Sequence, residues 1–434
     1  MAVTNPDRLT LRCYGVGFGD CFLMTFHYPD NTGDRHVLID FGSTQHPPNG
    51  KSGLMKLIAR DIATVVGERL HVLVATHRHA DHINGFATNA SKTGTGDIIA
   101  GLQPQLVIQP WTERPDAPKD FIGTGQSSMM GADDALRLSL QRMTTVAAAA
   151  AREARHLRVL GASEIQFIAI DGISNESAVR NLATMGKKTR AAYVRYGSKV
   201  SVKSLLPGVK VSILGPPTIK QKSDVLDQDP VNRDEYWHFA QFWKLRASVA
   251  TVTQGPASLF PASPSQRSLR KIPLESRWFV RRLRALRAQQ LLGLVRSMDD
   301  ALNNTSVILL FEAGGKKLLF PGDAQWENWE LALHKNGAQL KDVDVYKVGH
   351  HGSLNATPKT LWNAFTRKSE DRDQPGRLMT VMSTRSDSKH GHEENDTEVP
   401  RRTLVTELKK LSTHRSTQEL EADGALVLTL QFDL

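Results

Sequence analysis

The six residues from His77 to His82 read His-Arg-His-Ala-Asp-His and directly follow a short apolar stretch. A buried strand that ends in this pattern brings three imidazoles and a carboxylate into one small volume. Because alternate residues of an extended segment point to the same side, we expect His77 and His79 to face one ion. Asp81 and His82 follow where the chain turns, and they can face a second ion. Zinc and other borderline transition metals favour such mixed nitrogen and oxygen ligands, so we predict a metal site.

Length and composition set few further limits. With 434 residues, the chain can form one large domain with insertions or two to three average domains. Its only cysteines, Cys13 and Cys21, provide neither a disulfide framework nor a cysteine-based zinc knuckle. The first residues contain no apolar segment typical of a secretion signal. No apolar stretch approaches the roughly 20 residues of a membrane helix, so we expect a cytoplasmic protein without a membrane partner.

The charge balance favours an anionic partner. The chain has 55 Lys and Arg against 45 Asp and Glu, a formal net charge of +10. Two segments are notably basic: a helix expected at 277–287 and a stretch at 187–199. The cations of the helix, which we expect to contact the substrate, are Arg277, Arg281 and Arg284. The cations of the second segment are Lys187, Lys188, Arg190, Arg195 and Lys199.

Strand and helix patterns alternate along much of the chain. Strands are expected at 9–12, 21–26, 36–40, 70–76, 103–111, 191–196, 209–214, 306–311, 317–320, 343–348, 378–383 and 425–432. Helices are expected at 51–68, 128–160, 277–287, 325–336, 358–366 and 399–411. This alternation is typical of a layered α/β architecture.

Three further sites follow expected strands. Asp40 ends one strand, where a carboxylate commonly orients a metal-bound histidine. Asp323 closes a Pro-Gly-Asp turn and could bridge two cations roughly 3.5–4 Å apart. His350 and His351 close another strand; one of them would complete the second ion site while the other contacts the substrate or the leaving group.

The order of these motifs resembles the metallo-β-lactamase superfamily, in particular the hydrolase domain of the DNA-uptake protein ComEC and its free-standing relatives. The resemblance implies a four-layer αββα sandwich with metals at one edge of both sheets. It also implies zinc or manganese and the hydrolysis of phosphodiester or related bonds. The residues that carry the likeness are Val16–Asp20, Leu38–Asp40, Thr76–His82, Asn303–Ser306, Pro321–Asp323 and Lys347–Ser353.

Two features depart from the wider superfamily. Its members usually supply a third histidine to the first metal between the first motif and the bridging aspartate. Here only His156 and His238 lie in that interval, outside any motif, while Asn303 begins the Asn-x-x-Ser pattern of the ComEC-like relatives. Asparagine is a poor zinc ligand, so manganese or magnesium are alternatives for this site. The chain also has no membrane channel, so DNA uptake is not its task.

These observations predict a metal-dependent hydrolase in which a metal-activated water attacks phosphorus. The expected metal ligands are His77 and His79 for one ion, Asp81, His82 and His350 for the other, and Asp323 as the bridge. We assign catalysis to Asp81, Asp323 and His351. Asp40 and Asn303 are expected to support the metal ligands. Lys347 and Ser353 are expected to contact phosphate oxygens or the leaving group. His390 and His392 are expected in a solvated loop.

We expect one domain over residues 1–434, with largely helical, basic insertions at about 110–185 and 218–300 that form an active-site roof or a partner surface. The favoured function is that of a phosphodiesterase or nuclease acting on nucleic acid. One alternative is a hydrolase of a small ester, lactone, amide or nucleotide, whose activity would be insensitive to salt. The other is an effector subunit, for example of a defence system, that a protein partner switches on.

Overall fold

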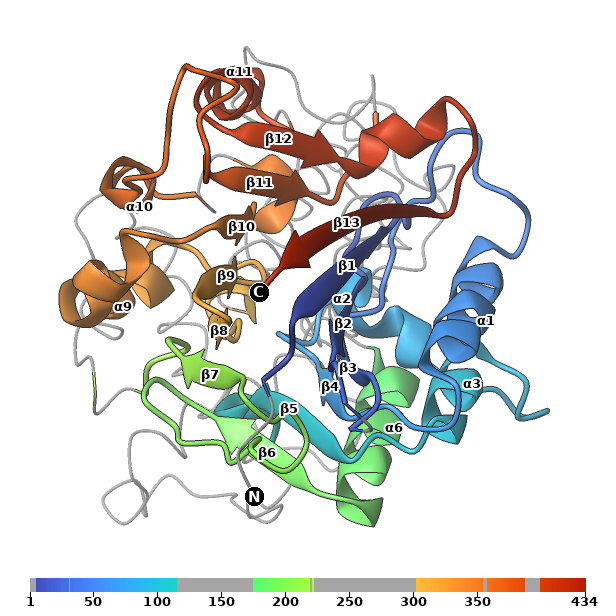
Figure 1. The fold of residues 1–434 in the computed structure, drawn as a ribbon. Coiled ribbons are helices and arrows are strands. Elements are labelled where there is room, and N and C mark those ends of the chain that lie inside the picture. The colour runs from blue at the N-terminus through green and yellow to red at the C-terminus, as the bar shows by residue number, and fades with distance from the viewer. Residues whose placement is uncertain are drawn as a thin grey trace, which may run out of the picture. The chain divides into compact units, whose positions relative to one another are not determined.

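Two β-sheets form the centre of the described part of the chain (Figure 1). The computed structural model describes residues 5–30, 32–114, 175–218, 221, 302–353, 357–386 and 399–434. The expected mixed α/β class is confirmed.

The first sheet has the strand order β13-β1-β2-β3-β4-β5-β6. Strands β13 to β3 are antiparallel, whereas β3 to β6 run parallel to one another. The bounds are β1 (Arg8–Tyr14), β2 (Phe22–His27), β3 (Arg35–Ile39), β4 (Val72–Val74), β5 (Leu106–Pro110), β6 (Ala191–Val194) and β13 (Val427–Asp433).

The second sheet has the order β12-β11-β10-β9-β8-β7. Here β9 to β12 are parallel, and β7 and β8 are antiparallel additions at one end. The bounds are β7 (Lys210–Ile213), β8 (Leu309–Ala313), β9 (Lys316–Phe320), β10 (Val345–Lys347), β11 (Met379–Met382) and β12 (Thr413–Ser416).

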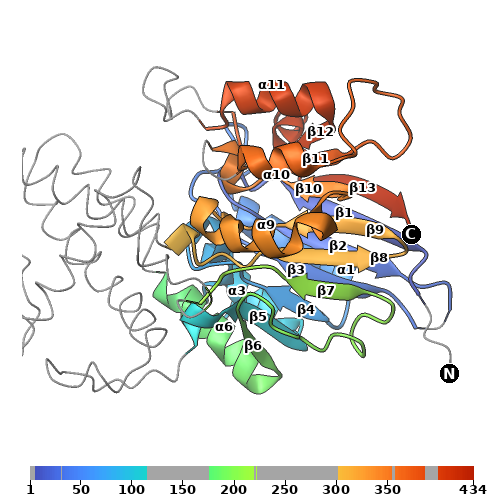
Figure 2. The same ribbon diagram turned by 90° about the vertical axis from the view of Figure 1, so that its left-hand side faces the viewer.

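Helices cover the outer faces of both sheets (Figure 1), and Figure 2 looks onto the helices of the second sheet. On the first sheet lie α1 (Leu54–Val66), α3 (Thr95–Gly101) and α6 (Glu176–Lys188). On the second lie α9 (Trp326–Leu340), α10 (Lys359–Ala364) and α11 (Arg402–Leu411). Short helical segments at the strand ends are α2 (Ala80–Ile83) and the 3-10 turns Asn84–Phe86, Trp111–Glu113, His350–Gly352 and Thr417–Glu421.

Side-chain alternation explains why the inner strands are apolar throughout. In β4, Val72 and Val74 point into the core between the sheets, whereas Leu73 points to the helices. In β9, Leu318 faces the same central core and Leu319 faces the second helical layer. A strand that is buried on both faces needs apolar residues at every position, so its sequence loses the alternation of a half-exposed strand.

Strand β12 and helices α2, α3 and α6 were not predicted from the sequence. Strand β12 reads Thr-His-Arg-Ser and lacks an apolar pattern; as an edge strand it is held by main-chain pairing to β11. Helices α3 and α6 were also missed, although α6 places Ala178, Leu182 and Met185 on one buried face. The helices expected at 128–160 and 277–287 lie outside the described residues.

The chain divides into two compact units. The first contains Met1–Trp111, Asn175–Thr218 and Asn303–Leu434, and the second contains Thr112–Ser174 and Ile219–Leu302. Helix α6, which the sequence suggested as part of an insertion ending near 185, belongs to the first unit. Within the described ranges, no helix is both long and apolar enough to cross a membrane.

Candidate metal centre

The histidine and aspartate motifs meet at one edge of the two sheets. Asp40 follows β3, His77 follows β4, Asp323 follows β9 and His351 follows β10. Each of these strands has a parallel neighbour in its own sheet, and parallel strands bring their carboxyl ends to a common edge. The topology therefore gathers residues that are up to about 300 positions apart in the sequence.

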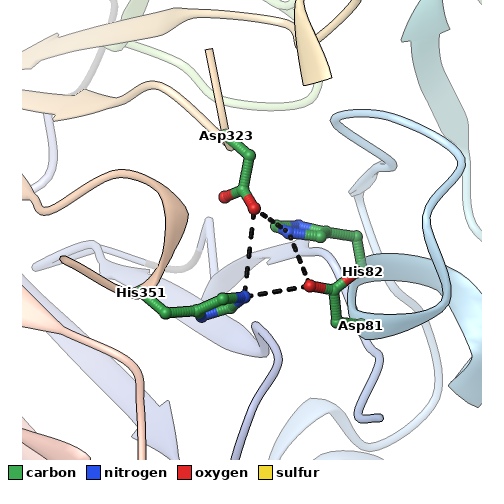
Figure 3. A group of neighbouring side chains, drawn as sticks. All are labelled: Asp81, His82, Asp323 and His351. Atoms are coloured by element: carbon green, nitrogen blue, oxygen red, sulfur yellow. Dashed lines mark hydrogen bonds and ion pairs between the residues drawn. The ribbon is translucent and has the colours of Figure 1, made fainter. Parts of the chain in front are cut away.

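Four ligand atoms form a compact group (Figure 3). Nε2 of His351 lies 3.0 Å from Oδ2 of Asp81, and Nε2 of His82 lies 3.0 Å from Oδ2 of Asp323. The two other contacts, His82 to Asp81 and His351 to Asp323, measure 3.9 Å. Two ligands of one tetrahedral zinc, each bound at about 2.0–2.2 Å, are roughly 3.3–3.6 Å apart. The observed spacing brackets that value, so these four residues fit a single ion.

A second group shares Asp81 with the first, whereas the sequence pattern predicts the bridging position for Asp323, which lies in the four-ligand group only. It contains His77, His79 and Asp81, whose ligand atoms all lie within 4.8 Å of one another. The rings of His77 and His79 are 4.7 Å apart. Nε2 of His77 is buried and has no hydrogen-bond partner among the described residues, which is the state expected of an atom that binds a cation.

Asp40 fixes the orientation of His82. Its Oδ2 accepts a hydrogen bond from Nδ1 of His82 at 2.7 Å, which turns Nε2 toward Asp323. The backbone N and the hydroxyl of Thr76 both donate to the same carboxylate at 2.7 Å. Asp40 thus occupies the predicted supporting position, as second-layer carboxylates do for metal-bound histidines.

His351, rather than His350, lies within the four-ligand group (Figure 3). Nδ1 of His351 donates to the carbonyl of Ser383 at 2.9 Å, so Nε2 can offer its lone pair to a cation. His350 is less deeply buried, and its Nε2 lies 4.0 Å from Asp323, although its backbone N donates to that carboxylate at 3.0 Å. The sequence had placed the ligand role on His350; the turn after β10 directs the other ring inward.

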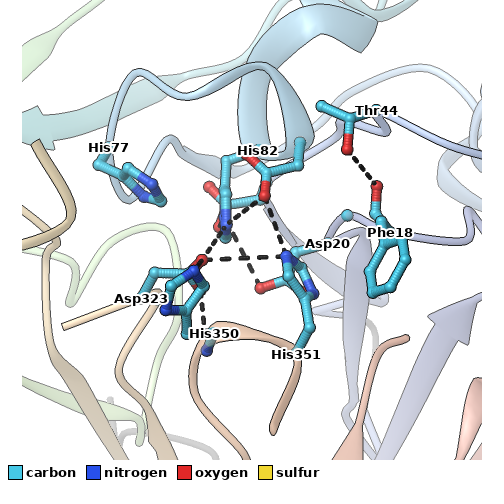
Figure 4. Close-up of polar contacts among 12 residues, drawn as sticks. Phe18, Asp20, Thr44, His77, His82, Asp323, His350 and His351 are labelled. Carbon is cyan, nitrogen blue, oxygen red and sulfur yellow. Dashed lines mark hydrogen bonds and ion pairs between the residues drawn. The ribbon is translucent and has the colours of Figure 1, made fainter. Parts of the chain in front are cut away.

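Lys347 is buried beneath the centre. Its side chain is 2% exposed, and its ammonium forms ion pairs with Asp20 and, at 3.5 Å, with Asp323 (Figure 4 labels both carboxylates). It also donates to the carbonyl of Gly322 at 3.1 Å. The expectation that Lys347 contacts a phosphate oxygen stays a prediction, and in this arrangement its ammonium group is already paired with two buried carboxylates.

Burial and charge set the protonation of the ligands in opposite ways. Burial lowers the pKa of His77 well below its usual range and also lowers the pKa of His79, so both imidazoles are neutral, the form that binds metals. For His82, burial is outweighed by the carboxylates of Asp323 and Asp40, which raise its pKa. For Asp323, burial is outweighed by His82 and Lys347, which lower its pKa well below the usual range.

The remaining predicted residues are distributed as follows. Asn303 is buried and lies beside His79. Ser353 is buried, and its hydroxyl has no hydrogen-bond partner among the described residues. Outside the described residues lie Arg277, Arg281 and Arg284 of the basic helix, together with His156, His238, His390 and His392.

Three supporting residues had no role assigned from the sequence. Asp20 pairs with Lys347, Thr76 donates twice to Asp40, and Ser383 accepts from His351. Asp20 closes the glycine-rich turn between β1 and β2, and its place in the segment Val16–Asp20, which carries part of the family likeness, was the available signal. Thr76 and Ser383 also follow strands, but their types and positions are common in ordinary turns.

The backbone at the centre is strained. Among the described residues other than glycine, positive φ angles occur at six positions, and three of them are Asp40 (56°), His350 (41°) and His351 (52°). Such conformations cost on the order of 1–3 kcal/mol each and persist where the surroundings enforce them. Gly42 is required for close packing here, because a Cβ at this position would collide with the backbone of Ala80 and Asp81.

No family model matches the chain, and no curated protein matches its sequence. The interpretation of the centre therefore rests on its own residues.

Proposed function

We propose that this protein is a metal-dependent hydrolase of the metallo-β-lactamase superfamily, acting as a phosphodiesterase or nuclease. The observation that carries the proposal is the pair of ligand groups that share Asp81 at the common edge of two sheets. Two adjacent sites joined by one carboxylate are the arrangement that hydrolases of phosphate esters use.

The layers of the fold support the superfamily assignment. A central core lies between the sheets, and a separate core lies under the helices on each outer face. This succession of helices, sheet, sheet and helices is what the αββα sandwich requires. The metal motifs follow the carboxyl ends of strands in both halves, in the order that the resemblance implies.

The donor set fits zinc or manganese at the four-ligand group, where Asp81, His82, Asp323 and His351 would hold the ion. His77, His79 and Asp81 would hold a second ion, with the oxygen of the nearby Asn303 favouring manganese or magnesium. Bound divalent cations supply Lewis acidity to a phosphoryl oxygen and lower the pKa of a water molecule.

The protein's own residues orient the metal ligands and balance the buried charge around them. Asp40 and Ser383 fix the rings of His82 and His351 through their Nδ1 atoms, so that both Nε2 atoms face the same point. Lys347 balances the charge of Asp20 and Asp323 from below, out of contact with solvent. The net charge of +10 supports an anionic substrate over a neutral ester or lactone.

The test is cleavage of labelled single- and double-stranded DNA and RNA by purified protein with Mn²⁺, Zn²⁺ or Mg²⁺. The His79→Ala/Asp81→Ala variant serves as the inactive form, and His334→Ala, which alters an exposed histidine of α9, serves as the matched control. We expect metal-dependent cleavage that the first variant loses and the second retains. Metal-dependent hydrolysis confined to small esters or lactones would contradict the nuclease assignment, and activity only with an added protein would favour the effector subunit.

A further inference from the structure

The basic charge of the first unit is concentrated in one segment. Residues 175–218 contain eight Lys and Arg but only one carboxylate, Glu176. By contrast, residues 5–114 contain ten cationic and ten acidic side chains. The cations of the segment are Arg180, Lys187, Lys188, Arg190, Arg195, Lys199, Lys203 and Lys210.

Most of these cations are exposed and lack a carboxylate partner. Lys210 pairs with Glu312 at 2.7 Å. Six of the other cations lie between Lys187 and Lys203, and we call them the basic face. All six are exposed, and none forms an ion pair with a described carboxylate. They are Lys187, Lys188, Arg190, Arg195, Lys199 and Lys203. Uncompensated cations on one surface create a positive potential that attracts polyanions.

The fold brings the basic face together from three elements. Lys187 and Lys188 form the last turn of α6, and Arg190 leads into β6 at the edge of the first sheet (Figure 1). Nη2 of Arg190 donates to the carbonyl of Ser201 at 2.7 Å. This bond holds the loop that carries Lys199 and Lys203 against the end of the helix.

Protection of an edge strand explains only part of this charge. Exposed edges are often guarded by lysines that prevent pairing with another sheet, and Arg190 and Arg195 flank β6 in that manner. Lys187 and Lys188 lie on a helix, as does the exposed Arg180, seven residues before Lys187. Residues seven apart lie on the same side of a helix, so the cations continue along α6.

Helix α6 connects the basic face with the metal centre. At its start, Nδ2 of Asn175 donates to the carbonyl of Arg78, between the ligands His77 and His79, at 3.1 Å. Its 13 residues extend about 20 Å from there to Lys188. At about 3.4 Å per nucleotide, this distance corresponds to roughly six nucleotides of a strand.

We propose that the basic face binds the sugar–phosphate backbone of a nucleic-acid strand whose scissile phosphodiester lies at the metal centre. This inference rests on the proposed function and narrows it, because a dinucleotide or other small phosphodiester would not reach from one end of α6 to the other. The expected substrate is a polymer with phosphates on at least one side of the cleaved bond.

The experiment measures binding of labelled 24-nucleotide phosphorothioate strands, which resist hydrolysis, to full-length protein with Mn²⁺ by fluorescence anisotropy. The variant is Lys187→Glu/Lys188→Glu/Lys199→Glu. Its charge-matched control is Lys51→Glu/Lys359→Glu/Lys409→Glu, three exposed lysines away from β6 and β7. We expect at least about tenfold weaker binding for the first variant only, and a plot of log affinity against log salt that is shallower by about two. A four-nucleotide strand should bind wild type and variant alike.

Equal loss of affinity in both variants, or in neither, would overturn the proposal. So would tighter binding of wild type to vesicles containing phosphatidylserine than to nucleic acid, with the same sensitivity to the first variant. Hydrolysis of bis(p-nitrophenyl) phosphate by wild-type protein tests the proposed function separately. Binding through the basic face without any such hydrolysis would contradict the proposed hydrolase function and support the basic face as a nucleic-acid-binding surface.

Discussion

The two ligand groups differ in how the fold supports them. The four-ligand group draws Asp81 and His82 from α2, and Asp323 and His351 from the segments that follow β9 and β10 of the other sheet. Further residues fix the ligands from behind, as Asp40 does for His82. In the second group, His77 and His79 come from the loop after β4, and Asp81 comes from α2, which follows that loop directly. Preorganised ligands lose less freedom on binding an ion, so the first site should bind more tightly than the second.

The largest effect should follow from removing a ligand of the four-ligand group. His82→Ala deletes the imidazole that faces Asp323 at 3.0 Å. We expect loss of the tightly bound ion and a fall in phosphodiester hydrolysis of more than about 100-fold, since supporting residues alone are worth 10–100-fold. Elemental analysis and turnover of the same preparation provide the measurement. Full metal content in this variant would contradict the claim that the four-ligand group is the tighter site.

Lys347→Met tests the charge beneath the four-ligand group. The change leaves Asp20 and Asp323 buried without their cation, which should destabilise the protein by about 3–5 kcal/mol. The control is Lys317→Met at the more exposed pair with Asp342, where we expect a loss of about 1 kcal/mol or less. Urea unfolding of metal-free protein gives both values. Similar losses for the two variants would show that burial does not distinguish these pairs.

Asp40→Asn tests support from the second layer. An amide at this position accepts from His82 more weakly than the carboxylate, so we expect metal affinity to fall about 10–100-fold while the fold persists. Competition with a chelator of known affinity measures the change. An unaltered affinity would indicate that the ligands of the other sheet hold the ion without help from Asp40.

Buried histidines for which burial outweighs the neighbouring charges provide a contrast to His82. Burial lowers the pKa of His36 and of His71 to about 4. The unfolded chain, with histidine pKa values near 6.5, then binds more protons than the folded protein between pH 6.5 and 4. Stability should therefore fall as pH falls through this window, by about 2 kcal/mol or more.

The control for this pH dependence is His36→Asn, which cannot titrate in the window. Its unfolding free energy should decline less steeply than that of wild type between pH 7 and 4, as measured by urea midpoints. Parallel curves for the two proteins would mean that His36 is not neutralised by burial.

The sequence predicted the components of the centre better than their arrangement. The motif from His77 to His82 predicted a metal site because its ligands are adjacent in the chain. Whether His350 or His351 turns inward depends on positive φ angles after β10, which neighbouring loops enforce and no local pattern encodes. The ion pair of Lys347 with Asp20 could not be predicted either, because Asp20 is more than 300 residues away in the sequence and only the packing of the two sheets brings it to Lys347.

The same reasoning applies to the fold. Apolar runs buried on both faces, such as β4 and β9, were predicted correctly because burial leaves a strong signal. Strand β12 was missed because main-chain pairing to β11 requires no particular side chains. Helix α6 was missed because its buried face has only three apolar side chains, Ala178, Leu182 and Met185, between polar residues and a glycine.

The most direct test of the central claim is a titration of metal-free protein with Mn²⁺ or Zn²⁺ by isothermal calorimetry, repeated with His77→Ala/His79→Ala. We predict two binding steps for wild type, a tight and a weak one, and only the tight step for the variant. A wild type that binds no metal, or a variant that loses the tight step and keeps the weak one, would contradict the account.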